Sequence, residues 1–185
     1  MNTPSINFYL TGMPPIHCKL DQSIKVSLLQ SLLLAIIAVF IILILMMHNP
    51  FYGLVGLLPI AFSLTAIFGF MGYTKIPLDI ATVLVGSISI GIGVDYSIHL
   101  LNRFSRERKR GLNTKEAMAR ALDTTGNAIF INDFTVILGF LALTFAQLIP
   151  LQNFGILVAI TMLGAGLGAL LILPSVIILI KKRRQ

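Results

Sequence analysis

Two acidic residues lie inside long apolar stretches of this sequence, Asp95 within 80–101 and Asp133 within 127–148. If these stretches cross a lipid bilayer, each carboxylate costs about 2.5–3.5 kcal/mol even on the more lenient insertion scale. Residues kept at such a cost are candidates for function. A carboxyl group at that position could take up and release a proton, so we interpret both as candidate proton-relay residues. For Asp133, a hydrogen-bonded structural role is an equal alternative.

The two acids are predicted to lie at the same depth. Asp95 is seven residues from Asn102, and Asp133 is seven residues from Gly126, at the ends of their stretches nearest each other in the sequence. At 1.5 Å per helical residue, both lie about 10 Å from the same edge of the apolar core. If the two helices face one another, the acids could share a proton or be connected through Tyr96 and Asn132.

Polar and small residues recur at every fourth position around Asp95: Ser87, Gly91, Asp95 and His99. This spacing places them on one side of a helix, as a polar track through an apolar segment. Histidine is the side chain that ordinarily changes charge near neutral pH, so His99 could relay a proton between Asp95 and one side of the membrane. The simpler interpretation, which we favour, is that the His99 side chain reaches toward the lipid headgroups.

Small residues predict where helices pack closely. The candidates are Gly86, Gly91 and Gly93 in the stretch that carries Asp95, and Gly164 and Gly168 in the last stretch. Small residues four apart let helix backbones approach one another in membranes. A glycine-rich helix could also slide or hinge, and packing without motion is the simpler interpretation.

The elements that must position these residues follow from the composition. Of the 185 residues, 56% are hydrophobic and 11% are charged, against roughly 45–50% and 25% in soluble domains. We therefore predict an all-α integral membrane protein. A spanning helix needs about 20 apolar residues, and five such stretches occur: 26–47, 51–73, 80–101, 127–148 and 154–180. The last could tilt, or kink at Pro174.

Lysine and arginine predict the orientation of these helices. Eleven of the fourteen basic residues fall in the loop 102–126 and in the last residues, 181–184. The positive-inside rule therefore places this loop and the tail 182–185 in the cytoplasm, and residues 1–25 outside as the end of an external segment. The basic loop could also bind anionic lipid headgroups. Within it, Asn113 and Glu116 predict a capped helix start.

Several classes of protein are excluded. Cys18 is the single cysteine, so no disulfide can form within the chain. The sequence has no metal-ligand cluster, phosphate-binding glycine loop or nucleophile triad, so we predict neither an enzyme nor a metal or cofactor site. Because most of its basic residues lie beside apolar stretches, the net charge of +7 indicates membrane orientation and not nucleic-acid binding.

A family resemblance rests on the run from Gly91 to Leu100, GIGVDYSIHL, followed by Arg103, Phe104 and Glu107. This run resembles the fourth-helix signature of the resistance–nodulation–cell division (RND) superfamily, in particular its MMPL-type and predicted hydrophobe exporters. Further matches are GNAI at 126–129, Asn132, and the pairs at 139–140, 154–155 and 173–174. The resemblance covers about residues 5–181, and the five-helix unit is also similar to a sterol-sensing domain.

The resemblance implies a proton-driven exporter of lipids or other hydrophobic molecules in the cell (inner, cytoplasmic) membrane. Such exporters have two halves, each with one helix, an external domain and five further helices, and this chain resembles the last five helices of one half. The resemblance assigns proton relay to Asp95 and Tyr96 but not to Asp133. It implies a lipid or hydrophobic substrate, and as partner the other half or an oligomeric copy. The alternative is a lipid-sensing or assembly module without proton coupling.

Overall fold

The computed structural model describes residues 13–77 and 80–182, and every regular element in these ranges is a helix. Five helical segments are long and apolar enough to cross a membrane: 30–47, 50–74, 84–109, 114–145 and 149–181. The predicted all-α fold with five spanning helices is confirmed. Residues 1–12 of the predicted external segment and 183–185 of the predicted tail lie outside the described residues.

The first helix, α1 (Met13–Met47), is 35 residues long and begins before the predicted start at residue 26. Pro14 and Pro15 fall in its first turn. The first backbone N–H groups of a helix have no intrahelical acceptor, so proline costs no hydrogen bond there. Only 11% of its apolar span is buried within the described chain. Its exposed side chains are large and apolar, among them Leu33, Leu34 and Leu45, so this surface is suited to lipid.

The second span is divided into α2 (Pro50–Gly56) and α3 (Leu58–Thr74). The tight turn before it is closed by Asn49, whose side chain accepts a hydrogen bond of 2.9 Å from the Phe51 backbone N–H. Pro59 lies in the first turn of α3 and has no N–H to donate to a carbonyl of α2. The break in this span therefore has a local cause in the sequence.

The third span, α4 (Ile80–Lys109), continues eight residues past its predicted end at residue 101. The continuation consists largely of arginine, glutamate and lysine, which are good helix formers although they end the apolar pattern. It is followed by α5 (Thr114–Ala121), whose predicted start is confirmed. The Asn113 side chain accepts a hydrogen bond of 2.9 Å from the Glu116 backbone N–H. In turn, the Glu116 side chain accepts a hydrogen bond of 3.4 Å from the Asn113 backbone N–H.

Replacing Asn113 by alanine is expected to destabilise α5 by about 1 kcal/mol, because the Glu116 backbone N–H loses its side-chain acceptor. The effect should appear as faster hydrogen exchange of the α5 amides in detergent micelles. Thr114→Ala changes the neighbouring residue without removing the cap and serves as the control. Equal exchange in the Asn113 variant and the unmodified protein would show that tertiary contacts alone hold α5.

The fourth and fifth spans each contain a π-helical turn. A π-turn, η1 (Leu122–Gly126), joins α5 to α6 (Asn127–Leu141), and a 3₁₀ turn, η2 (Ala142–Phe145), ends this span. The fifth span consists of α7 (Ile149–Leu167), a π-turn, η3 (Gly168–Ile172), and α8 (Leu173–Lys182). The irregularity predicted at Pro174 is therefore a π-turn that ends two residues before it.

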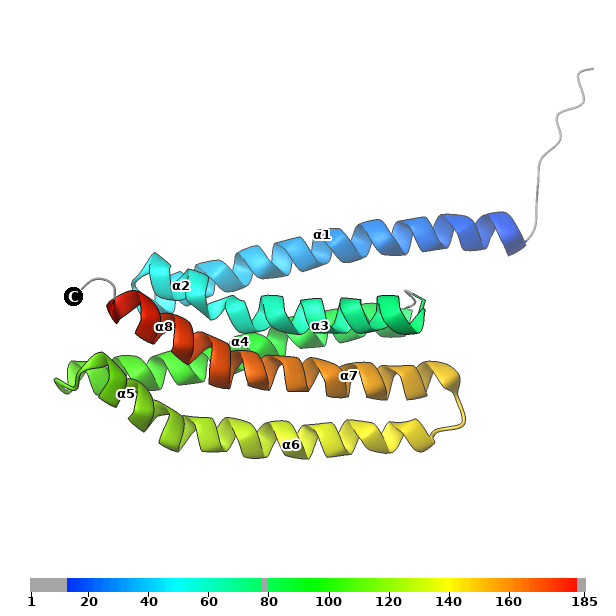
Figure 1. Cartoon of the computed structure of the whole chain (residues 1–185). Helices are drawn as coiled ribbons and strands as arrows, with labels where there is room; N and C mark the ends of the chain where they lie inside the picture. The colour runs from blue at the N-terminus through cyan, green and yellow to red at the C-terminus, as the bar shows by residue number, and fades with distance from the viewer. Residues whose placement is uncertain (1–12, 78–79, 183–185) are drawn as a thin grey trace, which may run out of the picture.

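The core of the bundle is formed by α3, α4 and α7, which pack against one another (Figure 1). The spans that contain α4 and α7 are the most buried, at 56% and 61%, whereas that of α6 is 11% buried. A serine pair crosses this core: the Ser63 and Ser89 hydroxyls are 2.9 Å apart, and Ser63 donates to the Thr161 carbonyl at 2.9 Å. The two serine hydroxyls thus find hydrogen-bond partners in the apolar interior.

Three of the five glycines expected at packing positions lie against neighbouring helices. A Cβ on Gly168 would be 2.7 Å from the Pro59 Cα, one on Gly164 would be 3.0 Å from the Ser63 Cα, and one on Gly93 would be 2.9 Å from the Ile60 Cγ1. Gly86 is buried as well. Gly91 differs from the expectation, because it lies on the exposed side of α4 with no atom within 4 Å of its Cβ position.

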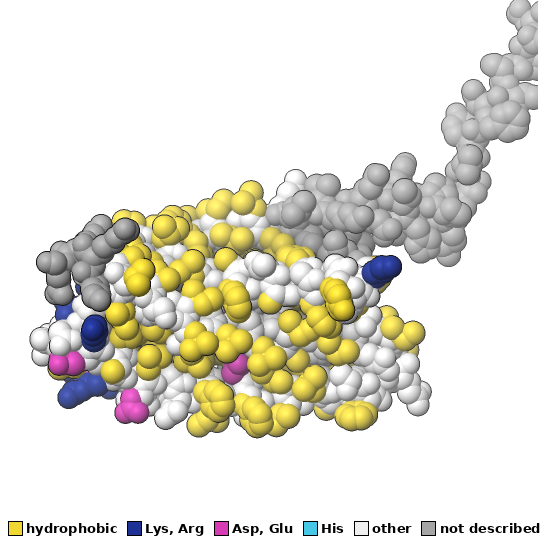
Figure 2. Space-filling view, viewed as in Figure 1, with side chains coloured by type: hydrophobic (Ala, Val, Ile, Leu, Met, Phe, Trp, Pro, Cys, Tyr) yellow, Lys and Arg dark blue, Asp and Glu magenta, His cyan; other side chains and the backbone are white. Residues whose placement is uncertain are grey.

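Charged residues gather at the ends of the molecule. The α1–α2 turn, α5 and α8 lie at one end, and the α3–α4 and α6–α7 connections lie at the other (Figure 1). Figure 2 shows apolar side chains along the body of this face and most of its described lysines and arginines at the end with α5. The side view therefore has the apolar middle and charged end expected of a bundle that crosses a bilayer.

Candidate functional site

The polar track predicted on the third span lies on the exposed side of α4. Ser87, Gly91, Asp95 and His99 are all exposed, although residues on either side of them, such as Val94 and Tyr96, are buried. Neither Asp95 nor His99 makes a side-chain hydrogen bond or ion pair within residues 13–77 and 80–182. Asp95 is thus available to a group outside the described chain.

Tyr96 connects α4 to α6. Its hydroxyl donates to Asp133 Oδ1 at 3.3 Å and accepts from Asn132 Nδ2 at 3.0 Å. Tyr96 and Asn132 are the two residues that the sequence offers as a link between α4 and α6 if these helices face one another. The direct meeting of the two acids does not occur in this structure: Asp133 is buried with 8% exposure, whereas Asp95, one residue before Tyr96, lies on another side of α4.

Asp133 is also enclosed by α7. A Cβ on Gly166 would lie 2.9 Å from the Asp133 Cγ and closer still to one carboxylate oxygen. The absence of a side chain at Gly166 therefore makes the space that the carboxyl group occupies. Gly166 was not predicted, because no spacing rule in the sequence pairs a glycine of the fifth span with an acid of the fourth.

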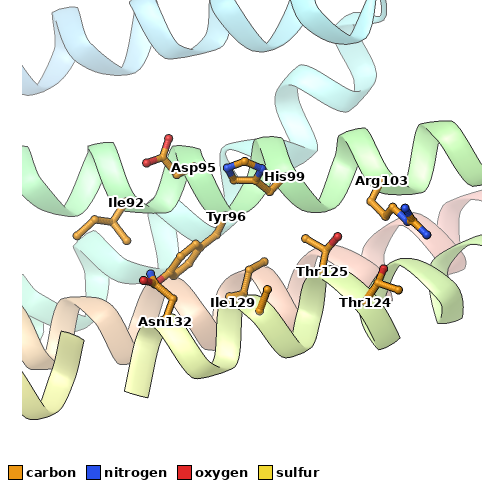
Figure 3. A pocket seen from close by; sticks show the side chains of 10 residues that line it. Ile92, Asp95, Tyr96, His99, Arg103, Thr124, Thr125, Ile129 and Asn132 are labelled. Atoms are coloured by element: carbon orange, nitrogen blue, oxygen red, sulfur yellow. The ribbon is translucent and has the colours of Figure 1, made fainter. Parts of the chain in front are cut away.

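A cavity of about 570 Å³ opens between α4 and the η1–α6 segment (Figure 3). It brings together three of the four predicted relay residues, while Asp133 lies behind Tyr96. Its walls carry polar groups at both ends and apolar groups among them. The lining residues are Ile92, Asp95, Tyr96, His99, Arg103, Thr124, Thr125, Ala128, Ile129 and Asn132. Figure 3 shows Tyr96 directed toward Asn132 and Asp95 directed away from it.

Comparison with known proteins decides the family. The MMPL family matches residues 2–184. The chain belongs to the MMPL family. Relatives include a membrane protein of Methanocaldococcus jannaschii (34% identical; 95% of this chain and 45% of the relative). MmpL12 of Mycobacterium tuberculosis, named a probable transport protein, is 30% identical over 80% of this chain and 13% of the relative. The sulfolipid-1 exporter MmpL8 of the same species is 28% identical over 80% of this chain and 14% of the relative. The chain spans less than half the length of these relatives.

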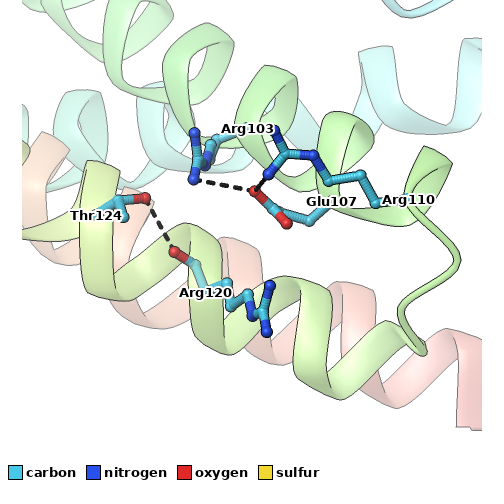
Figure 4. A network of polar contacts seen from close by, with 5 residues as sticks. All are labelled: Arg103, Glu107, Arg110, Arg120 and Thr124. Carbon is cyan, nitrogen blue, oxygen red and sulfur yellow. Dashed lines mark hydrogen bonds and ion pairs between the residues drawn. The ribbon is translucent and has the colours of Figure 1, made fainter.

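This MMPL chain has a further buried acid at the cytoplasmic end predicted for α4. Glu107 is fully buried. Its Oε1 forms an ion pair with Arg103 Nη2 at 3.0 Å and accepts a hydrogen bond from Arg110 Nη1 at 3.1 Å (Figure 4). Its other oxygen, Oε2, has no partner in the described residues. Two guanidinium groups on one carboxylate leave this cluster with one net positive charge. These residues fall within the predicted loop 102–126, because a run of charged residues ends the apolar pattern although the helix continues.

Replacing Tyr96 by phenylalanine is expected to destabilise the MMPL bundle by about 1–3 kcal/mol, because buried Asp133 and neighbouring Asn132 lose a partner without gaining another. Chemical unfolding in mixed micelles measures this change. Tyr52→Phe, which alters a partly buried tyrosine at the end of the bundle, is the control. An unchanged free energy of unfolding for Tyr96→Phe would mean that the link between α4 and α6 adds nothing to stability.

The described residues contain no group of three or more histidine, cysteine, aspartate or glutamate side chains able to hold a metal ion. The side chains that line the cavity provide carboxyl, phenol, imidazole and guanidinium groups. These groups exchange protons and bind charged or polar partners.

Proposed function

We propose that this chain forms part of a proton-driven exporter of lipids or other hydrophobic molecules. The observation that carries the proposal is the polar track on the exposed side of α4, with Asp95 at its centre. Exposed apolar side chains are typical of the rest of the bundle. A carboxyl group on such a surface is costly in lipid and is typical of proton and substrate pathways.

The polar track on α4 also supports the presence of a partner unit that packs against this helix. Because Asp95 and His99 have no polar partner in the described chain, a second helical unit that covers α4 would remove them from lipid and supply hydrogen-bonding groups. We propose that this unit is the other half of the exporter or a second copy of the chain. The site is then completed only in the assembly.

The relay we propose begins at Asp95. Protonation of this carboxyl group removes a charge from the α4 surface, which changes how tightly the glycine-containing helix packs against its partner. Tyr96, on the adjacent side of α4, carries the displacement to Asp133 and Asn132 through its two hydrogen bonds. One charge that moves through 100 mV supplies about 2.3 kcal/mol for such a change.

The proposed arrangement sets the basic end in the cytoplasm of a cell membrane. The α5 end of the bundle carries the described cations of α4, α5 and α8, and the positive-inside rule places such an end in the cytoplasm. His99 and Arg103 then lie between Asp95 and the cytoplasm, and both line the cavity.

Reconstitution tests the proposed function. The transporter assembled with its partner is placed in liposomes that hold a pH-sensitive dye and a fluorescent acyl lipid, and a pH gradient is imposed. We expect movement of the lipid only when the gradient is present, together with proton flux. Lipid binding with no flux of either kind would instead favour the sensing or assembly module. In that case, bulky residues at Gly164 or Gly168 should disturb binding, and Asp95→Asn should not.

A further inference from the structure

Two helix irregularities that are far apart in the sequence lie against each other in the bundle. The second span is broken at Leu57, between α2 and α3, and the fifth span has the π-turn η3 between α7 and α8. A Cβ on Gly168, the first residue of η3, would be 2.7 Å from the Cα of Pro59 in the first turn of α3. Sharp bends in helices occur at prolines and at π-turns. The two bends are therefore adjacent and can share one axis.

The segments beyond these bends, α2 and α8, lie side by side at the α5 end of the bundle (Figure 1). The Lys181 ammonium of α8 lies 5.8 Å from the centre of the Tyr52 ring on α2 and 5.9 Å from that of the Phe104 ring on α4. A cation over an aromatic ring is attracted to it, so this lysine joins α8 to α2. Movement of one of these short helices would draw the other with it.

The third span passes both bends without a break, because α4 is one helix from Ile80 to Lys109. A buried hydroxyl connects it to α2: Ser97 Oγ donates to the Gly56 carbonyl at 2.8 Å. Gly56 is the last residue of α2, and the last carbonyls of a helix have no intrahelical donor. Ser97 supplies a donor at the point where the second span is broken.

Ser97 also has an acceptor within its own helix. Its Oγ lies 2.9 Å from the Gly93 carbonyl, one turn earlier in α4. A hydroxyl has a single hydrogen to donate, so it can bond fully to the Gly56 carbonyl or to the Gly93 carbonyl, but not to both. If α2 moves away, the Ser97 hydroxyl keeps a partner in α4. The contact between the two helices can therefore open without leaving a buried donor unsatisfied.

We propose that the α2–α3 break and η3 form a paired hinge, on which α2 and α8 move together against the unbroken α4, and that Ser97 is the contact that opens and closes. The π-turn η1 follows this movement, because a Cβ on Gly126 would be 3.4 Å from the Leu170 Cδ2 in η3. Since η1 contributes Thr124 and Thr125 to the cavity beside α4, the movement changes the width of that cavity. The proposal does not depend on proton coupling, because it concerns how the helices of this chain move.

Distances between pairs of spin labels test the paired hinge. The labels are attached to introduced cysteines in the full chain with Cys18→Ser, in lipid nanodiscs. One pair joins Arg106 on α4 to Leu179 on α8, and the other joins Arg106 to Leu167 on α7, before η3; all three positions are exposed. We expect a distance distribution with two components for the first pair and one narrow component for the second. A single narrow component for both pairs overturns the proposal.

A third pair tests whether α2 and α8 move together. It joins Leu54 on α2, which is also exposed, to Leu179 on α8. We expect one component, as narrow as that of the Arg106–Leu167 pair, because both labels lie beyond the hinge. Two components for this pair would mean that the two helices move separately, which contradicts a paired hinge.

Ser97→Ala removes the contact that we assign to the closed position. We expect it to raise the population of the minor component of the Arg106–Leu179 pair about fivefold, as for the loss of one hydrogen bond. Ser89→Ala is the matched control, because Ser89 is a fully buried serine of the same helix whose partner, Ser63, lies on α3 and not on α2.

The control should leave the distance distribution unchanged. No shift in Ser97→Ala, or an equal shift in both variants, overturns the role of Ser97. The label pairs in the chain that keeps both serines decide the hinge itself, even where a serine variant fails to fold.

Discussion

Asp95→Asn is expected to reduce proton-coupled transport to the level of protein-free liposomes while the bundle remains inserted and folded. Asparagine has nearly the shape of aspartic acid, but its side-chain amide cannot take up and release a proton as a carboxyl group does. The structural cost should be small, because Asp95 is exposed and makes no hydrogen bond within the described residues. The measurement is proton flux across liposomes with an imposed pH gradient, with lipid movement recorded in parallel.

Asp123→Asn is the matched control for this prediction. Asp123 is also an exposed acid, but it lies on η1 and does not line the cavity. Its replacement should leave the coupled flux unchanged. Transport retained by Asp95→Asn would remove Asp95 from the relay. Loss of transport in both variants would point to a general effect of charge and not to one carboxyl group.

The second large effect is expected from Gly168→Ala, which should destabilise the bundle by about 1–3 kcal/mol. The new Cβ would lie 2.7 Å from the Pro59 Cα, and a backbone atom cannot rotate away as a side chain can. Either η3 and α3 separate, or the π-turn changes shape. Unfolding in mixed micelles, followed by circular dichroism, measures the loss of stability.

Gly139→Ala tests whether the cost comes from this contact. Gly139 lies within α6, and its Cβ position has no atom within 4 Å. Alanine is favoured over glycine in a helix by up to about 1 kcal/mol, so this variant should be as stable as the original or more so. If both variants were equally destabilised, close packing of η3 on α3 would not be the cause.

The helices themselves were largely predictable. Runs of about 20 apolar residues are a strong signal, and the start of α5 followed from Asn113 and Glu116, because a capping box depends on residues close in sequence. The end of α4 was missed for the converse reason. Its last turns are stabilised by charged side chains, including the Arg103–Glu107 pair one turn apart. In a hydropathy profile such a charged run looks like a loop.

The depth of the site residues in the membrane was predictable, but the rotation of the helices that carry them was not. Depth along a helix follows from counting residues, so Asp95 and Asp133 were expected at the same level, and a link through Tyr96 and Asn132 depended on the two helices facing one another. In the structure Tyr96, and not Asp95, contacts Asp133. The rotation of each helix about its axis depends on contacts between distant segments. The exposure of Asp95 and the space that Gly166 leaves for Asp133 both depend on such contacts. Neither could be predicted from a single sequence.

The length of α1 has a mechanical consequence. An unbroken helix of 35 residues is about 52 Å long, whereas the apolar core of a bilayer is about 30 Å thick. Figure 1 shows its N-terminal part extending past the ends of the other helices. Such a rod acts as a lever: a tilt of about 10° at its base near Met47 would displace Met13 by about 9 Å. Small rearrangements within the bundle would thereby become large displacements at the far end of α1.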